Sequence, residues 1–122
     1  MLTEERAQAL AAAWIAAWNA HDLDAILAHY HDDVVFSSPF AVELAGRADG
    51  TLTGKDQLRD YFERALQSFP DLQFRDLDVR VSAASICLVY RSVRDLVAAE
   101  TMVLDEDRRV VRVYAYYGPA AA

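Results

Sequence analysis

Residues 14–39 read WIAAWNAHDLDAILAHYHDDVVFSSP, and this stretch decides the fold class of the chain. It predicts an amphipathic helix, a polar break, a short second helix, a second break and a strand that stops at a proline. Residues 53–69, TGKDQLRDYFERALQSF, predict a third helix, and only strand-like runs follow it. Helices that precede a meandering sheet are typical of the α+β class.

The first helix is predicted to begin after Thr3, a residue suited to capping a helix N-terminus. Glu4 and Glu5 follow in the first turn, where the helix dipole favours acidic side chains. Apolar residues then recur at helical spacing and form one large face: Ala7, Leu10, Ala11, Trp14 and Trp18. The polar run 19–22 ends this helix and caps the next.

The next segments are divided by two further breaks. The second helix is predicted to carry an inward stripe formed by Leu23, Ile26, Leu27 and Tyr30. A turn at residues 31–33 then leads to a strand at Val34–Ser38, which Pro39 ends, and residues 40–53 are expected to form a loop. The third helix begins at Thr53 or Gly54 and ends before Pro70. Its buried face is predicted to contain Leu58, Tyr61, Phe62, Ala65, Leu66 and Phe69.

The last fifty residues alternate between apolar and polar side chains, as strands do. The alternation changes phase near Asp76, which predicts a β-bulge. Three further strands are expected at 85–93, 96–105 and 109–118, and the short polar turns between them predict an antiparallel meander.

Composition limits the function classes. The chain has 122 residues, of which 54% are hydrophobic, so it can bury a core, and we expect one domain over residues 1–122. A net charge of −7 argues against nucleic acid as a partner. No apolar run approaches the roughly 18 residues that span a bilayer, and no signal peptide is visible. The single cysteine, Cys87, is interpreted as a buried core thiol and fits a cytoplasmic protein.

The order of these elements, together with WIAAWNAHDLD and VVFSSPF, resembles the nuclear transport factor 2-like superfamily, especially its SnoaL-like and ketosteroid isomerase-like members. The resemblance covers nearly the whole chain. It implies a cone-shaped, curved antiparallel sheet wrapped around three N-terminal helices, a cystatin-like roll, with an apolar pocket inside. It does not imply one function, because this superfamily contains enzymes, binding proteins and interaction modules.

The resemblance also argues against steroid isomerisation. In the ketosteroid isomerase pattern an aspartate before the strand-ending proline is the base, and here that position is Ser38. The position of the tyrosine that donates to the oxyanion holds Trp14, and the position of the second donor, a protonated aspartate, holds Glu100. A serine without its own base does not abstract a carbon-bound proton.

Two other patterns of the superfamily are incomplete as well. The acidic residue that SnoaL-like cyclases carry on the last strand is replaced within Val113–Ala115. The aspartate–arginine–aspartate set of limonene epoxide hydrolase-like members is missing, because Arg91 and Arg112 fall on the strand face opposite to Glu100.

Glu100 is therefore the candidate catalytic residue. It is interpreted either as an acid with a raised pKa, or as a structural residue that reaches solvent or bonds to a tyrosine hydroxyl. The residues expected around a substrate are Trp14, Trp18, Tyr30, Ser38, Tyr90, Met102, Ala115 and Tyr117.

No metal site or cofactor is expected. His29 and His31 lie beside Asp32 and Asp33, but residues two apart on a helix point to different sides. His21 lies at a helix break, where a capping or exposed role is expected.

Three function classes remain open: an isomerase-, cyclase- or hydrolase-type enzyme acting on a small hydrophobic compound, a non-catalytic binder of such a compound, and a protein-interaction module. The outer face of the last strands combines tyrosines and arginines with aliphatic residues, a composition typical of interfaces. This predicts a homodimer through Arg91, Arg112, Tyr114 and Tyr116.

Overall fold

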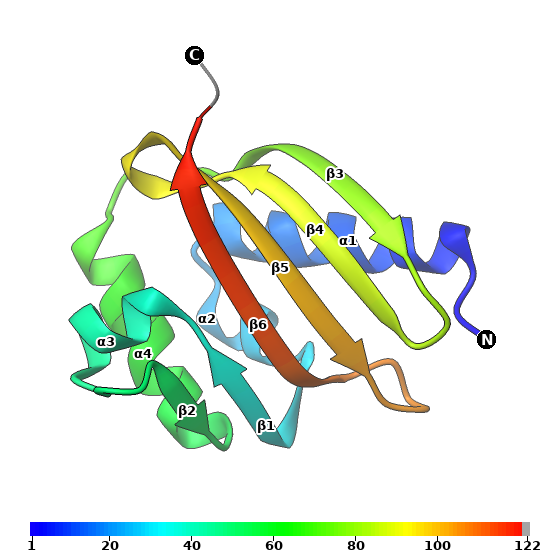
Figure 1. The fold of residues 1–122 in the computed structure, drawn as a ribbon, viewed down its shortest axis with the longest axis horizontal. Coiled ribbons are helices and arrows are strands. Elements are labelled where there is room, and N and C mark those ends of the chain that lie inside the picture. The colour runs from blue at the N-terminus through cyan, green and yellow to red at the C-terminus, as the bar shows by residue number, and fades with distance from the viewer. Residues whose placement is uncertain (121–122) are drawn as a thin grey trace.

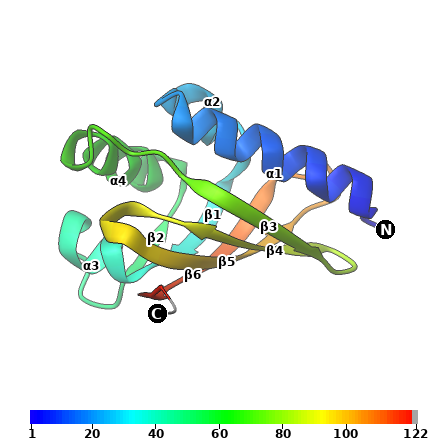
Figure 2. The ribbon, with the colours of Figure 1, turned by 90° about the horizontal axis from the view of Figure 1, so that it is seen from above.

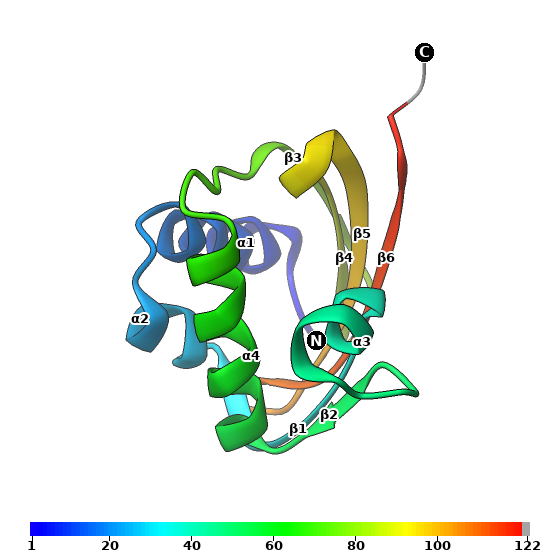
Figure 3. The same ribbon diagram turned by 90° about the vertical axis from the view of Figure 1, so that its left-hand side faces the viewer.

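One curved sheet and the helices on its concave side make up the molecule, as a computed structural model that describes residues 1–120 shows (Figures 1 and 3). The helices are α1 (Glu4–Asn19), α2 (Leu23–Leu27), α3 (Pro39–Ala45), α4 (Lys55–Ser68) and the 3-10 turn η1 (Val93–Asp95). The strands are β1 (Tyr30–Ser37), β2 (Thr51–Thr53), β3 (Arg75–Val81), β4 (Ser85–Arg91), β5 (Leu96–Leu104) and β6 (Val110–Pro119). The predicted α+β class is confirmed.

The strand order is β2-β1-β6-β5-β4-β3, and the sheet does not close. The four C-terminal strands form the predicted antiparallel meander. The expectation of a wholly antiparallel sheet is wrong at one place, because β1 runs parallel to β6. Residue alternation reports which face of a strand is buried and carries no information on strand direction, so the sequence pattern did not indicate this pairing.

Helix α1 lies across the concave face of the sheet (Figure 2). Its two tryptophans, Trp14 and Trp18, are buried. The Thr3 hydroxyl caps the helix by accepting a hydrogen bond from the Arg6 N–H at 3.2 Å. At the other end, the Asn19 side chain binds the backbone of Phe74 twice: its amide donates to the carbonyl at 2.9 Å, and its oxygen accepts from the N–H at 2.7 Å. Asn19 therefore fixes the end of α1 to the segment that enters β3.

The segment around Tyr30 differs from the prediction. Helix α2 ends at Leu27, and Tyr30 begins β1, where it pairs with Val110. The predicted turn at residues 31–33 lies within this strand, at a shift of register between Tyr30 and Val35. The strand accommodates these polar residues because Asp32 and Asp33 are exposed there.

The predicted loop at residues 40–53 contains α3 and β2 instead. Ser38 caps α3, Pro39 occupies its first turn, and Gly46 ends it with a φ of 66°. Gly50 lies against the backbone of Ser38, since a Cβ atom there would be 2.9 Å from the Ser38 carbonyl oxygen. Only Phe40 and Ala41 of α3 are buried, and so short an apolar stripe gave no periodic signal.

The predicted bulge is confirmed: Asp76 has a φ of 59°, and the β3–β4 register shifts between Arg75 and Asp78. Most of the predicted core is buried, although Tyr30 is buried in β1 and not in a helix, and Leu10, Leu23 and Phe69 are only partly buried. Leu66 is only partly buried, and the residues that are less than 10% exposed include Trp14, Trp18, Ile26, Tyr30 and Phe62. Among residues 1–120 no helix has both the length and the apolar character needed to cross a membrane.

We expect Asn19→Ala to lower the free energy of unfolding by about 2 kcal/mol, because it leaves the Phe74 N–H and carbonyl without their partner. Urea denaturation measures this loss. The matched control is Gln73→Ala, which removes an exposed bond to the Asn19 carbonyl and should cost less than about 0.5 kcal/mol. Equal losses in the two variants would contradict the role assigned to the Asn19 side chain.

Candidate functional site

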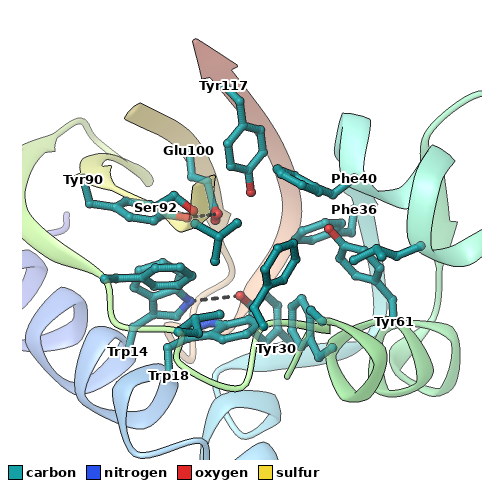
Figure 4. Close-up of a pocket in the computed structure, with 17 residues that line it drawn as sticks. Trp14, Trp18, Tyr30, Phe36, Phe40, Tyr61, Tyr90, Ser92, Glu100 and Tyr117 are labelled. Atoms are coloured by element: carbon teal, nitrogen blue, oxygen red, sulfur yellow. Dashed lines mark hydrogen bonds between the residues drawn. The ribbon is translucent and has the colours of Figure 1, made fainter. Parts of the chain in front are cut away.

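An aromatic cavity of about 40 Å³ lies between α1, α4 and the concave face of the sheet (Figure 4). Its wall is formed by Trp14, Trp18, Tyr30, Phe36, Phe40, Leu44, Tyr61, Phe62, Ala65, Phe69, Leu72, Phe74, Tyr90, Ser92, Val93, Glu100 and Tyr117. This volume accommodates water molecules but not an organic molecule of ordinary size. Glu100 is the one carboxyl group in the wall.

Glu100 is buried at the centre of the sheet with 4% of its surface exposed. It lies on β5 between Leu88 of β4 and Ala115 of β6. The Tyr90 hydroxyl donates a hydrogen bond of 2.6 Å to its Oε1 atom. Its Oε2 atom has no partner among the described residues. One half of the carboxyl is thus fixed by the protein, and the other half is available to a molecule in the cavity.

Burial raises the pKa of Glu100 to about 7, although the hydrogen bond from Tyr90 opposes the shift. Removal from water disfavours the charged form, and a donor to the carboxylate favours it. A pKa near 7 means that the acid and the carboxylate are both populated at neutral pH, which suits a group that gives and takes a proton.

The Trp18 indole N–H is the other buried side-chain atom without a partner among residues 1–120, and Trp18 also lies in the cavity wall. Trp14, one helical turn away, donates to the Tyr30 hydroxyl at 3.0 Å. A buried polar atom without a partner costs about 1–3 kcal/mol and calls for an explanation. The two atoms here are Glu100 Oε2, which accepts a hydrogen bond or carries the acid proton, and the Trp18 indole N–H, which donates. Both belong to residues of one cavity wall.

The phenol groups of the wall stay protonated at neutral pH. Burial raises the pKa of Tyr30, Tyr61, Tyr90 and Tyr117, and the nearby charge of Glu100 adds to each shift. The Tyr117 hydroxyl points into the cavity on the same side as Glu100 (Figure 4). The wall therefore offers hydrogen-bond donors around one titratable carboxyl.

Ser38, which corresponds to the base of the ketosteroid isomerase pattern, is a helix cap. Its Oγ atom accepts a hydrogen bond of 3.2 Å from the Phe40 N–H, and the Tyr61 hydroxyl donates to it at 3.5 Å. It is 2% exposed and is not part of the cavity wall.

Six of the residues named from the sequence are in the wall: Trp14, Trp18, Tyr30, Tyr90, Glu100 and Tyr117. Met102 and Ala115 are buried on the same face of the sheet but do not reach the cavity. Met102 lies two residues beyond Glu100 on the same face of β5, and the Ala115 side chain is too short to reach the cavity.

Several wall residues were not predicted as site residues from the sequence. Phe36 and Tyr61 belong to apolar patterns that mark a strand and a helix, so a signal for their burial was present. Phe40 and Ser92 lie in segments expected to be a loop or a strand end, and their burial depends on how α3 and η1 fold back.

The histidines lie apart from the cavity wall. The His31 Nδ1 atom accepts a hydrogen bond of 3.0 Å from the Asp33 N–H, and partial burial lowers the pKa of His29. His21 has a φ of 57° and its Nε2 atom lies 2.8 Å from the Leu72 carbonyl. Within residues 1–120 no three histidine, cysteine or acidic side chains gather as metal ligands would.

Comparison with known proteins agrees with this architecture. The sequence profile of the SnoaL-like domain matches residues 11–117. The chain belongs to the SnoaL-like family. A crystal structure of a SnoaL-like protein of unknown function from Burkholderia thailandensis is 42% identical to it, with a TM-score of 0.90, over 95% of this chain and 97% of the other. The resemblance inferred from the sequence is confirmed.

More distant structures share the fold of this SnoaL-like protein. A candidate ketosteroid isomerase from Kribbella flavida has a TM-score of 0.73 at 19% identity, over 97% of this chain and 82% of the other. A candidate polyketide cyclase from Xanthomonas campestris has a TM-score of 0.71 at 20% identity, over 93% and 91%. No curated protein matches the sequence.

We expect Glu100→Gln to stabilise the SnoaL-like protein at high pH relative to the parent. The pKa of Glu100 rises on folding from 4.5 to about 7. The parent therefore loses stability as the pH rises through this window, and the contribution of Glu100 to the free energy of unfolding is lowest above pH 7. The variant lacks this loss and should gain about 3 kcal/mol on the parent between pH 4 and pH 8.

Urea unfolding of both proteins across this range measures the difference. Glu63→Gln, which removes an exposed carboxyl from α4, is the matched control and should follow the parent. A constant difference between Glu100→Gln and the parent would show that the Glu100 carboxyl titrates normally.

Proposed function

We propose that this SnoaL-like protein is an enzyme that transfers protons on a small hydrophobic carbonyl compound, with Glu100 as both acid and base. One observation carries the proposal: a buried carboxyl with a pKa of about 7 has one oxygen fixed by Tyr90 and the other without a partner in an aromatic cavity. Perturbed carboxyls in apolar cavities are typical of acid–base sites.

The proposed step uses groups of the wall alone. The Glu100 carboxylate takes a proton from the carbon beside the carbonyl, and the electron pair of the C–H bond moves to form the enolate. Hydrogen bonds from the Trp18 N–H and the Tyr117 hydroxyl stabilise the oxygen that gains charge. The protonated Glu100 then returns its proton to carbon, at the same or another position.

The single carboxyl distinguishes this proposal from the two-group scheme of the ketosteroid isomerase pattern. Ser38 caps α3 and lies outside the wall, so no second group replaces the missing base. This same observation favours the second candidate, a non-catalytic binder, in which Glu100 and Trp18 hold a polar group of the ligand without reaction.

Exchange of carbon-bound hydrogen separates the two candidates. We expect the parent protein to accelerate deuterium uptake from D2O beside the carbonyl of at least one compound in a panel of hydrophobic cyclic ketones, followed by NMR. Glu100→Gln should lower this rate by about a hundredfold or more. In the parent the rate should rise with pH to a plateau, with its midpoint near pH 7, because the carboxylate is the base.

Glu63→Gln again provides the control and should exchange at the parent rate. Exchange that survives in Glu100→Gln would contradict the acid–base role. Ketones that quench the fluorescence of Trp14 and Trp18 without any exchange would instead establish the binder.

We also propose a homodimer through the convex face of the sheet, which the helices leave uncovered (Figure 3). Cross-strand neighbours there form two rows: Cys87, Thr101 and Tyr114, and Val89, Ala99 and Tyr116. The prediction of a buried Cys87 is wrong, since it is partly exposed on this face. Exposed tyrosines among aliphatic side chains are characteristic of interfaces.

A second copy fits this face because most charges on and beside it already have partners. Arg91 donates to Asp95 at 2.6 Å, and Arg80 donates to Asp78 at 2.7 Å. These two aspartates would therefore enter a contact between two identical faces already paired with an arginine. Arg112 donates to the Tyr114 hydroxyl at 3.2 Å.

We expect sedimentation equilibrium at micromolar concentration to give the mass of a dimer. Tyr116→Lys should give the monomer mass, because Tyr116 is 58% exposed in the single chain and would place a charge in the contact. Val42→Lys on α3, where Val42 is 48% exposed, is the control and should remain dimeric. A monomeric parent would contradict the proposal.

A further inference from the structure

A second hollow, of about 350 Å³, lies directly outside the aromatic cavity. The two spaces share four residues, Phe69, Leu72, Ser92 and Val93, which therefore form a wall between them. The hollow is polar on its outer side, where it is lined by Asp71, Gln73, Arg75, Arg91, Arg94 and Asp95.

The inner cavity is too small to hold an organic ligand by itself. Sites for small molecules usually measure about 300–1,000 Å³, whereas the inner cavity measures about 40 Å³. A molecule that reaches Glu100 must therefore displace part of the surrounding wall. The four-residue wall is the place where such a displacement joins the cavity to a space of sufficient size.

The outer hollow offers more hydrogen-bond donors than acceptors. Asp95 Oδ1 accepts from Arg91 at 2.6 Å and lies 3.5 Å from an Arg75 nitrogen, so one carboxylate oxygen serves two guanidinium groups. Arg75 also lies 3.9 Å from Asp76, and Asp71 adds a second carboxylate to the lining. Three arginines with five N–H donors each therefore face two carboxylates of the lining. A ligand group bound here is accordingly an acceptor oxygen.

Arg94 connects η1 to α3 beside the wall. Its guanidinium donates two hydrogen bonds to Glu43 of α3, at 2.8 and 3.1 Å, and lies 5.3 Å from the ring centres of Phe40 and of Phe69. Arg94 follows Val93 of the wall directly, and both aromatic rings line the inner cavity. The contact between Arg94 and Glu43 thus joins η1 to α3 across the wall.

We propose that the ligand site spans both spaces and takes an elongated amphipathic molecule, whose apolar ring system lies against Trp14 and Glu100 and whose acceptor oxygens bind Arg75 and Arg91. The Arg94–Glu43 ion pair must break before the wall between the two spaces opens, and we call this pair the latch. This inference rests on the inner site of the proposed function and adds to it the class of ligand and the route of access.

The closing experiment uses 8-anilinonaphthalene-1-sulfonate, which combines apolar rings with acceptor oxygens, and N-phenyl-1-naphthylamine, which has the same rings without the sulfonate. Energy transfer from Trp14 and Trp18, the two tryptophans of the chain, detects either probe at the cavity. We expect Arg75→Gln and Arg91→Gln each to weaken sulfonate binding at least fivefold and to leave the neutral probe unchanged. Arg112→Gln on the convex face should change neither.

Stopped-flow association tests the latch. Glu43→Gln removes the ion pair and should speed association a few-fold, whereas Arg94→Gln removes the ion pair and both cation–π contacts and should speed it about tenfold. Because both remove the same ion pair, the double variant should be no faster than Arg94→Gln. Arg64→Gln, which breaks a different bond to α3, at the Leu44 carbonyl, should leave the rate unchanged.

Equal binding of the two probes, independent of Arg75 and Arg91, would overturn the ligand class. Association rates that are unaffected by Glu43 and Arg94 would overturn the latch, and failure of both probes to bind would overturn the inference as a whole. None of these outcomes depends on Glu100 chemistry. The proposed function, in contrast, is tested by hydrogen exchange in the parent and in Glu100→Gln.

Discussion

The structure depends on how the concave face of the sheet is covered. Helix α1 places Trp14 against Phe74 and Tyr90, with ring centres 5.9 and 5.3 Å apart. Trp18 packs 4.8 Å from Phe62 of α4. Large, rigid rings from three directions cover a curved surface but do not fill it, and a cavity remains where they meet. The position of α1, which Asn19 fixes to the entrance of β3, therefore determines that the cavity exists.

Among residues 1–120, Glu100 is the one acidic side chain that is buried. A carboxyl among aromatic rings destabilises the folded state when it is charged, and a single hydrogen bond from Tyr90 compensates only in part. Apolar residues surround it on β5, where an aliphatic residue would pack without this cost. A destabilising group in the wall of a cavity is a common feature of functional sites, and the unpartnered Trp18 N–H lies in the same wall.

Ser38 shows how one position of a fold serves different purposes. In the ketosteroid isomerase pattern this position supplies the base, whereas here its oxygen begins α3 by accepting from Phe40 N–H. Helix α3 in turn brings Glu43 to Arg94 and Phe40 to the cavity wall. Ser38 thus supports the wall in which the Glu100 carboxyl lies.

The sequence by itself determined the helices α1, α2 and α4, the meander and the bulge at Asp76, because periods of 3.6 and 2 residues depend on local geometry. The inward direction of Glu100 followed from the resemblance to the superfamily, because alternation alone does not say which strand face is inside. The sequence also indicated six wall residues, since burial follows from the same periods. The tertiary structure alone decided the parallel pairing of β1 with β6, the existence of α3 and β2, and the places of Phe40 and Ser92 at the cavity. It alone decided that Cys87 faces outward and that Ser38 is a cap. These features depend on which segments meet in space, and contacts between residues far apart in the chain leave no period in its sequence.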